Sequence, residues 1–285
     1  GTTAVVYTAL DAAGNSAICS FTVTVDDTEL PSITCPADII VLATDVNDCN
    51  AFVAMDAPIS SDNCGVLSVL NDYNNTLAGS DYYPSGITDV VWTVTDIYGN
   101  SSNCSMTVTV TDAQDPVIFC PSDVIAVADL GVCESSLFIE SPIATDNCNG
   151  ASIGHEITYP DLSTSGTVTS ADASGIYPVG LSSIVYTALD ASGNSTSCTV
   201  TVTVTDTELP VISACPSDIV VANTIGVCES PVNWIAPTSS DNCGVISFTS
   251  NVAIGSVFSV GTTAVVYTAL DAAGNSAICS FTVTV

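Results

Sequence analysis

The stretch Cys19-Ser-Phe-Thr-Val-Thr-Val-Asp-Asp-Thr-Glu-Leu-Pro-Ser-Ile-Thr-Cys35-Pro36 decides how this chain is organised. An alternating strand ends at Val25, a short acidic linker ends in Pro31, and a Cys-Pro pair starts the next segment. The same succession runs from Cys104 to Pro121 and again from Cys198 to Pro216. The pattern indicates a series of small repeats joined by acidic linkers, and we expect function at these linkers.

The spacing of these linkers reveals two periods. The linker prolines lie at 31, 116 and 210, so the first two repeats are 85 and 94 residues long. Residues 1–25 are identical to residues 261–285, which sets a larger period of 260 residues (261 − 1) containing three repeats. We expect a segment of a longer tandem array, and the alternative is a duplicated terminus in a short protein. The predicted parts are residues 1–25 (the end of a preceding repeat), 26–111, 112–205 and 206–285.

The charge balance narrows the classes of partner. The chain has 30 Asp and Glu, one His and no Lys or Arg, a net charge of −30 at pH 7. Nucleic acid and anionic membrane surfaces need a basic face, so both are excluded as partners. The repulsion between clustered carboxylates can be relieved only by solvent cations, bound metal or protonation. His155 lies in a variable segment, where we expect it to be exposed to solvent. No stretch of the sequence is both apolar enough and long enough to span a membrane.

The cysteines predict disulfides. Four fall at matching positions in each repeat, which is typical of two disulfides per small domain in an oxidising, extracellular compartment. Four cysteines allow three pairings. Zinc binding is a weaker interpretation of these cysteines than disulfides, because there is no Cys-x2-Cys spacing. The sets are Cys35, Cys49, Cys64 and Cys104; Cys120, Cys133, Cys148 and Cys198; and Cys215, Cys228, Cys243 and Cys279, with Cys19 in the partial repeat.

Apolar periodicity predicts an all-β fold. Phe21, Val23 and Val25 alternate with threonines, a period of two that indicates a strand with one face in a core. An Asp-x-x-Gly-Asn segment precedes each such strand, and its Gly-Asn pair closes a hairpin. About seven short strands per repeat, without any helical period, predict tandem immunoglobulin-like β-sandwiches. Trp234 then belongs to a core.

Four motifs recur in the same order: Asp-x-x-x-Pro-x-Ile-x-Cys-Pro, Asp-Asn-Cys, an aromatic turn such as Tyr83-Pro84-Ser-Gly86, and Asp-x-x-Gly-Asn-x-x-x-Cys. Together they resemble the hyalin repeat (HYR) family over all three repeats and the leading fragment. The resemblance implies an Ig-like module of extracellular adhesive or matrix proteins, often in long tandem arrays of a bacterial type, and no enzymatic activity.

The resemblance also implies a disulfide pairing. It favours the first cysteine of a repeat with the fourth, which leaves the second with the third. The geometry of this inner pair is less favourable, because the bond would join opposite ends of one strand. The implied pairs are Cys35–Cys104 and Cys49–Cys64, Cys120–Cys198 and Cys133–Cys148, and Cys215–Cys279 and Cys228–Cys243.

The linkers carry the candidate metal ligands. In a sandwich of this kind the entry linker, the Asp-Asn-Cys turn and the final hairpin share one pole. Hard oxygen ligands without any lysine suit Ca²⁺, which takes six to eight oxygens. The alternative is that Asp and Asn only cap turns and the acidity gives solubility. The predicted ligands are Asp27, Glu29, Asp62, Asn63, Asp96 and Asn100; Asp112, Asp115, Asp146, Asn147, Asp190 and Asn194; and Asp206, Glu208, Asp241, Asn242, Asp271 and Asn275.

These features predict a structural role outside the cell. The chain would be a segment of a filament, surface fibre or stalk, stiffened by calcium and stapled by disulfides. Its partners would be further copies of the 260-residue repeat, covalent or end to end, together with other filaments, cell-surface glycans or proteins. The alternative is an adhesin that binds glycan or protein through the insertion Tyr159 to Tyr177 or through Asp81-Tyr82-Tyr83. An enzyme is disfavoured, because the acids recur at every linker rather than in one cleft.

Overall fold

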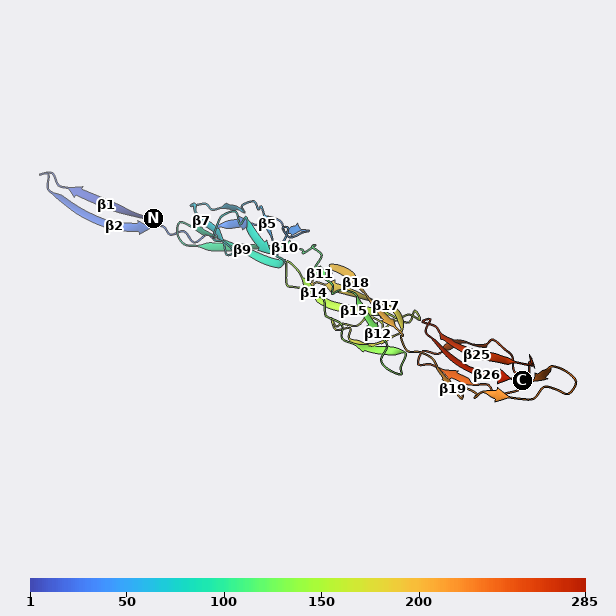
Figure 1. Cartoon of the computed structure of the whole chain (residues 1–285). Coiled ribbons are helices and arrows are strands. Elements are labelled where there is room, and N and C mark those ends of the chain that lie inside the picture. The colour runs from blue at the N-terminus through green and yellow to red at the C-terminus, as the bar shows by residue number, and fades with distance from the viewer. The chain divides into compact units, whose positions relative to one another are not determined.

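The computed structural model describes all 285 residues, and its regular elements are all β-strands (Figure 1). The chain forms two compact units, which are described separately. Unit 1 comprises residues 1–115, 146–149 and 191–194, and unit 2 comprises residues 116–145, 150–190 and 195–285. No helix with the length and apolar character of a membrane span occurs.

Unit 1 contains a hairpin followed by a β-sandwich. The hairpin pairs β1 (Thr2–Leu10) with β2 (Ser16–Thr24). In the sandwich, one sheet has the order β4-β10-β9-β7, with β4 parallel to β10, and the pairs β3-β6 and β5-β8 form the opposite layer. The strands are β3 (Ser32–Thr34), β4 (Ile39–Val41), β5 (Asn50–Val53), β6 (Ile59–Ser61), β7 (Val66–Asn71), β8 (Asp81–Pro84), β9 (Gly86–Asp96) and β10 (Ser101–Val110).

The core of this sandwich lies between its two layers. Val53 and Tyr83, from β5 and β8, pack with Trp92 and Val108, from β9 and β10. Trp92 is fully buried, and its indole nitrogen donates a hydrogen bond of 3.0 Å to the Leu77 carbonyl. Inward residues of β9 alternate with outward ones, as the period of two predicts.

Unit 2 repeats the same topology twice. Its four-stranded sheets have the orders β12-β18-β17-β15 and β20-β26-β25-β23, and its two-stranded sheets are β11-β14, β13-β16, β19-β22 and β21-β24. The all-β, Ig-like sandwich prediction is therefore confirmed. The strands are β11 (Val117–Phe119), β12 (Val124–Val127), β13 (Glu134–Leu137), β14 (Ile143–Thr145), β15 (Ser152–Thr158), β16 (Gly175–Pro178), β17 (Gly180–Leu189), β18 (Ser195–Thr205), β19 (Val211–Ser213), β20 (Ile219–Val220), β21 (Glu229–Pro231), β22 (Thr238–Ser240), β23 (Val245–Ser250), β24 (Val257–Ser259), β25 (Thr262–Asp271) and β26 (Ser276–Thr284).

Each sandwich of unit 2 has its own core. Tyr177, Tyr186 and Val202 belong to the first. Trp234 packs against the second and donates a hydrogen bond of 2.8 Å from its indole nitrogen to the Tyr267 hydroxyl, so its predicted core position is confirmed. The prediction for His155 is wrong: this residue lies in β15, is buried, and bonds to the Ser170 carbonyl through Nδ1 at 2.7 Å. The long segment after β15 folds back over it, which the sequence did not reveal.

An aspartate anchors the last strand in every sandwich. Asp38 accepts a hydrogen bond of 2.7 Å from the Thr107 amide just before the parallel pairing of β10 with β4 begins. Asp123 and Asp218 accept the equivalent bonds from Thr201 and Thr282 at 2.8 and 2.7 Å. Backbone hydrogen bonds lower the pKa of Asp123 and of Asp218. These acids therefore have a structural role.

The first cysteine of each repeat is bonded to the fourth, as the resemblance implied. The disulfides Cys35–Cys104, Cys120–Cys198 and Cys215–Cys279 span 69, 78 and 64 residues. Each joins the entry segment to the last strand and so closes most of one repeat into a loop.

Replacing Cys35 and Cys104 by alanine removes the disulfide of the unit 1 sandwich. The unfolded chain then gains freedom over 69 residues, and we expect the free energy of unfolding to fall by roughly 4 kcal/mol. Urea unfolding followed by Trp92 fluorescence, in a Trp234→Phe background, measures this sandwich alone. The matched control is Cys19→Ser at a free, exposed cysteine, which should leave the midpoint unchanged. Equal midpoints for the two variants would contradict the prediction.

Candidate functional site

Three clusters of acidic side chains form at the linkers. In each cluster the carboxylate oxygens lie within 4.8 Å of one another. In the first and third clusters the linker, the Asp-Asn-Cys turn and the last residue of a hairpin strand (β9 or β25) supply one aspartate each, whereas the second has only the linker and turn aspartates beside Cys148. The first cluster is Asp27, Asp62 and Asp96, the second includes Asp112 and Asp146, and the third is Asp206, Asp241 and Asp271.

The linker and turn aspartates present oxygens that have no hydrogen-bond partner. In the first cluster Oδ1 of Asp27 accepts the Glu29 amide at 3.1 Å, and Oδ1 of Asp62 accepts the Cys64 amide at 2.9 Å. The second oxygen of both residues is buried and unpaired. The other clusters repeat this arrangement with one unpaired, buried oxygen on each of Asp112, Asp146, Asp206 and Asp241.

The hairpin aspartate is held differently. Both oxygens of Asp96 accept hydrogen bonds, Oδ2 from the Asn100 side chain at 2.7 Å and Oδ1 from the backbone of Tyr98 and Asn100. Burial raises the pKa of Asp96, but these bonds together outweigh it and leave the pKa below its ordinary value. Asp271 and Asn275 form the same pair, with the same direction of the pKa. Asp190, the equivalent residue of the middle repeat, is also buried.

This arrangement has an electrostatic cost. An ionised carboxylate is expensive to bury unless its charge is paired. Here two unpaired oxygens from different aspartates lie within one cluster, and the chain contains no lysine or arginine to pair with them. A cation bound between the unpaired oxygens would remove the repulsion, so the donor set fits a hard divalent ion.

Several predicted ligands lie elsewhere in the hydrogen-bond network. The Glu29 carboxylate accepts a bond of 2.6 Å from the Asn63 side chain, and Asp115 is exposed and outside the cluster. The amides of Asn100, Asn194 and Asn275 use their nitrogen to hold the linker carbonyls of Asp27, Asp112 and Asp206. These asparagines therefore fix the linkers. Of the predicted aspartates, the structure brings together all except Asp115 and Asp190 in the three clusters.

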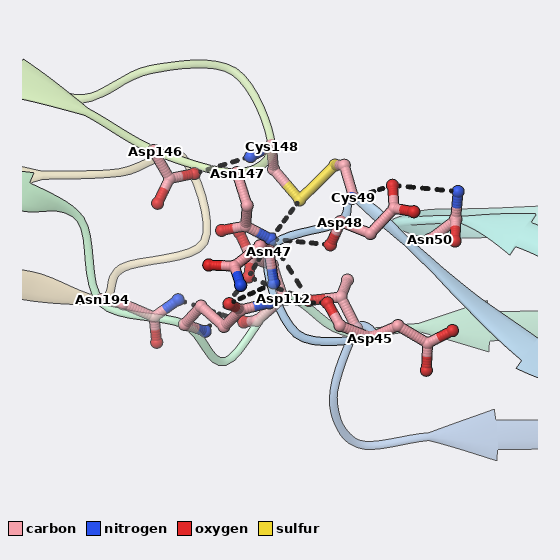
Figure 2. Close-up of a disulfide and its surroundings, with 12 residues drawn as sticks. Asp45, Asn47, Asp48, Cys49, Asn50, Asp112, Asp146, Asn147, Cys148 and Asn194 are labelled. Atoms are coloured by element: carbon pink, nitrogen blue, oxygen red, sulfur yellow. Dashed lines mark hydrogen bonds between the residues drawn. A yellow bond between two sulfur atoms is a disulfide. The ribbon is translucent and has the colours of Figure 1, made fainter.

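A disulfide lies beside two of the clusters, and it corrects the implied pairing. In unit 1 Cys49 is bonded to Cys148, as Figure 2 shows, and in unit 2 Cys133 is bonded to Cys243. The second cysteine of one repeat thus joins the third cysteine of the next, and Cys64 and Cys228 are free. The pairs Cys49–Cys64, Cys133–Cys148 and Cys228–Cys243 are wrong because the chain runs in sequence through two extended strands, such as β5 and β6, between their members. In this disulfide Cys148 is no thiolate ligand, although it lies in the second cluster.

Hydrogen bonds surround each of these disulfides. The amide nitrogen of Asn147 donates to the Asp48 carbonyl at 2.9 Å (Figure 2), and that of Asn242 donates to the Val132 carbonyl at 3.0 Å. The linker side chains Gln114 and Glu208 accept bonds of 3.0 and 2.8 Å from the Asn47 and Gly131 amides. Sequence reasoning missed the loops before Cys49 and Cys133. The asparagine or glycine two residues before the cysteine was their only signal.

The HYR domain model matches residues 1–25, 26–110, 111–204 and 205–285. The chain belongs to the HYR domain family. Hyalin of Strongylocentrotus purpuratus is 32% identical over 298 residues, covering 100% of this HYR chain and 23% of that protein. Hyalin of Lytechinus variegatus is 33% identical over 294 residues, covering 100% of this chain and 52% of that protein.

A rat relative extends the comparison to a multidomain protein. "Sushi, von Willebrand factor type A, EGF and pentraxin domain-containing protein 1" of Rattus norvegicus is 34% identical over 171 residues, which are 59% of the HYR chain and 4% of that protein. The chain therefore spans only part of each of these relatives. All of them come from animals, so the expectation of a bacterial-type protein is not borne out.

Among solved structures, the mouse cadherin-23 EC22-24 structure has a TM-score of 0.38 and 13% sequence identity, covering 90% of the HYR chain and 98% of its own. The protocadherin gammaB7 EC3-6 structure has a TM-score of 0.34 and 16% sequence identity, covering 100% of the HYR chain and 85% of its own. These similarities are too low to carry an argument about function.

The Asp96–Asn100 pair makes a pH prediction. A pKa lowered in the folded state stabilises the fold above the ordinary pKa of the carboxyl, and that stability is lost as the pH falls through the folded value. Asn100→Ala removes the side-chain hydrogen bond, the largest interaction that lowers the Asp96 pKa, and leaves burial and the backbone bonds in place, so the Asp96 pKa should rise and acid unfolding should begin at higher pH. Carbon-detected NMR titration of the carboxyl in chelator, with Trp92 fluorescence, measures both effects. The control Asn275→Ala removes the equivalent bonds to Asp271 and to the Asp206 carbonyl in a different repeat and should leave Asp96 unchanged; an unmoved Asp96 pKa in Asn100→Ala would contradict the assignment.

Proposed function

We propose that this chain is a structural segment of an extracellular filament or surface fibre, in which calcium ions stiffen the linkers between HYR repeats. One observation carries the proposal: at each of the three linkers, two aspartates direct unpaired, buried oxygens into one cluster. A catalytic cleft would occur once, whereas this arrangement recurs with every repeat. No enzymatic activity is proposed.

Calcium suits the donor set better than a transition metal. The free donors are carboxylate oxygens, and no histidine lies among them; the nearby sulfur atoms belong to the disulfide-bonded Cys148 and to the free Cys64, whose thiol pKa is raised chiefly by a hydrogen bond with Asp27. Asp27 and Asp62, Asp112 and Asp146, and Asp206 and Asp241 would hold one ion per linker. A bound ion would tie the linker to the Asp-Asn-Cys turn. Extracellular modules bind calcium with dissociation constants of about 10⁻⁴ to 10⁻³ M, and we expect this range.

The extracellular location and the partners follow from the same features. Five disulfides in one chain need an oxidising compartment. The hyalins are similar over the whole of this chain. Partners would be further copies of the 260-residue repeat and, beyond them, other filaments, cell-surface glycans or proteins.

Calorimetric titration tests the calcium sites. We expect heat of Ca²⁺ uptake at millimolar concentration, and Asp112→Asn should remove one of the sites because it neutralises one of two unpaired oxygens. The matched control is Asp115→Asn, three residues along the same linker, where the side chain is exposed and outside the cluster. No uptake by the unchanged chain, or equal loss in both variants, would disprove the assignment.

Electron microscopy of the native material tests the filament. Fibres that are straight in calcium should become flexible after chelation, because each linker loses its ion and regains carboxylate repulsion. A repeat along the fibre that corresponds to three HYR repeats is expected. Compact particles, or fibres indifferent to chelation, would contradict the proposal.

One observation favours adhesion as a second candidate. Phe52 and Tyr82 face each other on β5 and β8 with ring centroids 5.4 Å apart, and both are exposed. Exposed aromatic rings suit binding of a glycan or protein. By contrast Tyr177, at the end of the insertion, is buried in a core, where its hydroxyl bonds to Ala173. Compact particles in the electron microscope would favour adhesion over the filament as the function of this chain.

A further inference from the structure

The loop before the second cysteine has one conformation in all three repeats. The Asp45 amide bonds to the Asn50 carbonyl at 2.7 Å, and the Asp48 amide bonds back to Asp45 at 3.0 Å. Residues 129–134 form the same two bonds at 2.8 and 3.1 Å, and residues 224–229 form them at 2.8 and 3.1 Å. The carbonyl of the cysteine itself also accepts one amide in every copy, for example that of Val260 at Cys228. The loop that carries the free Cys228 is therefore built like the two loops that carry bonded cysteines.

The Asp-Asn-Cys turn is equally constant. The amides of Cys64, Cys148 and Cys243 each donate to the preceding turn aspartate at 2.9 Å. Two of these cysteines are disulfide-bonded, whereas Cys64 is free and exposed. Cys64 is thus presented in the same way as the two cysteines that receive a loop.

Three contacts join the loop of one repeat to the Asp-Asn-Cys turn and the linker of the next, wherever both are present. The disulfide is the first, and the second is the bond from the turn asparagine to the carbonyl just before the loop cysteine. In the third, a linker side chain accepts the amide two residues before that cysteine, as Glu208 does from Gly131. That residue has a positive φ, 62° at Asn47 and 78° at Gly131. We call this set the three-point clamp.

The chain carries two unmatched halves of the clamp. The loop half consists of Cys228, the Val227 carbonyl and the Gly226 amide, and Gly226 has the same backbone conformation, with a φ of 88°. The Val227 carbonyl accepts the Asn223 side chain at 2.7 Å and has a second lone pair for the clamp. The turn half consists of Cys64, the Asn63 amide and the Glu29 carboxylate. Because no loop is present there, Asn63 and Glu29 bond to each other at 2.6 Å. Each donor in one half has its acceptor in the other.

We propose that Cys228 of one copy of this chain forms a disulfide with Cys64 of the next copy, inside a three-point clamp. Asn63 then donates to the Val227 carbonyl, and Glu29 accepts the Gly226 amide. The inference rests on the end-to-end arrangement of copies in the proposed function but needs no calcium. In the 260-residue period the counterpart of Cys64 falls at 324, which is 96 residues after Cys228 (324 − 228), against 99 and 110 for the two bonded pairs.

Formation of this bond is an oxidation. Two thiols lose two protons and two electrons, and a disulfide of low molecular weight or of an oxidoreductase takes them up and leaves as two thiols. Every linker of the period then carries a covalent clamp, and each of the four cysteines of a repeat is paired.

Complementary variants test the bond. Cys64→Ser and Cys228→Ser, both in a Cys19→Ser background, are oxidised in a glutathione buffer, alone and mixed. The mixture should give a disulfide dimer on a non-reducing gel, whereas each variant alone should stay monomeric. Peptic digestion and mass spectrometry should find one peptide pair containing Cys64 and Cys228; trypsin is of no use in a chain without lysine or arginine. Dimers of the single variants, or thiols in the mixture that stay open to iodoacetamide, would overturn the proposal.

The clamp has a matched control in its own sequence. Gln114 fills the position of Glu29 at the second linker, so Glu29→Gln should cross-link at the unchanged rate, whereas Glu29→Ala should cross-link roughly 3- to 10-fold more slowly for the loss of one hydrogen bond. Equal rates would reject the docking contact. Every reaction is run with calcium and with chelator: fibres with a free Cys64 would refute this bond alone, and cross-linked chains without fibres would refute only the filament.

Discussion

The absence of any lysine or arginine is the constraint on which the linkers depend. Without cationic side chains, aspartates are held by neutral donors, which here are backbone amides, hydroxyls and the side chains of asparagines such as Asn100 and Asn275. Such bonds fix the carboxylate but leave its charge in place. Each linker therefore combines precise geometry with unrelieved negative charge, and this combination makes a bound cation the natural complement of the fold.

The sequence predicted the strands and the aspartate clusters for the same reason. Both depend on local patterns that recur in each repeat: alternation with threonine for the strands, and an aspartate at the linker, the turn and the hairpin. Asp27, Asp62 and Asp96 do come together. The hydrogen-bond partners of individual side chains could not be predicted in this way. Glu29 and Asn63 satisfy each other, and Asp115 remains exposed, because these outcomes depend on side-chain geometry that no spacing encodes.

The pairing of the second cysteine with the third was wrong for a different reason. Four cysteines per repeat are equally consistent with two bonds inside a repeat and with one inside plus one shared with each neighbour, because a shift by one repeat keeps the count even. Cys49 and Cys148 meet because a loop and a turn from successive repeats lie together in unit 1. A count made within one repeat cannot detect a partner in the next. The left-handed residue before the loop cysteine, such as Asn47, marks a tight turn but not its partner.

The duplicated 25 residues separate what is local from what is not. In β1–β2 and β25–β26 the same sequence forms the same antiparallel register, with Tyr7 opposite Cys19 and Tyr267 opposite Cys279. Yet Tyr7 is 63% exposed and Cys19 is free, whereas Tyr267 is 6% exposed and Cys279 is bonded to Cys215. The hairpin thus encodes its own pairing, while its burial and its redox state come from strands elsewhere in the repeat. By the same physics the state of a free cysteine such as Cys64 is set by what docks against it rather than by its own turn.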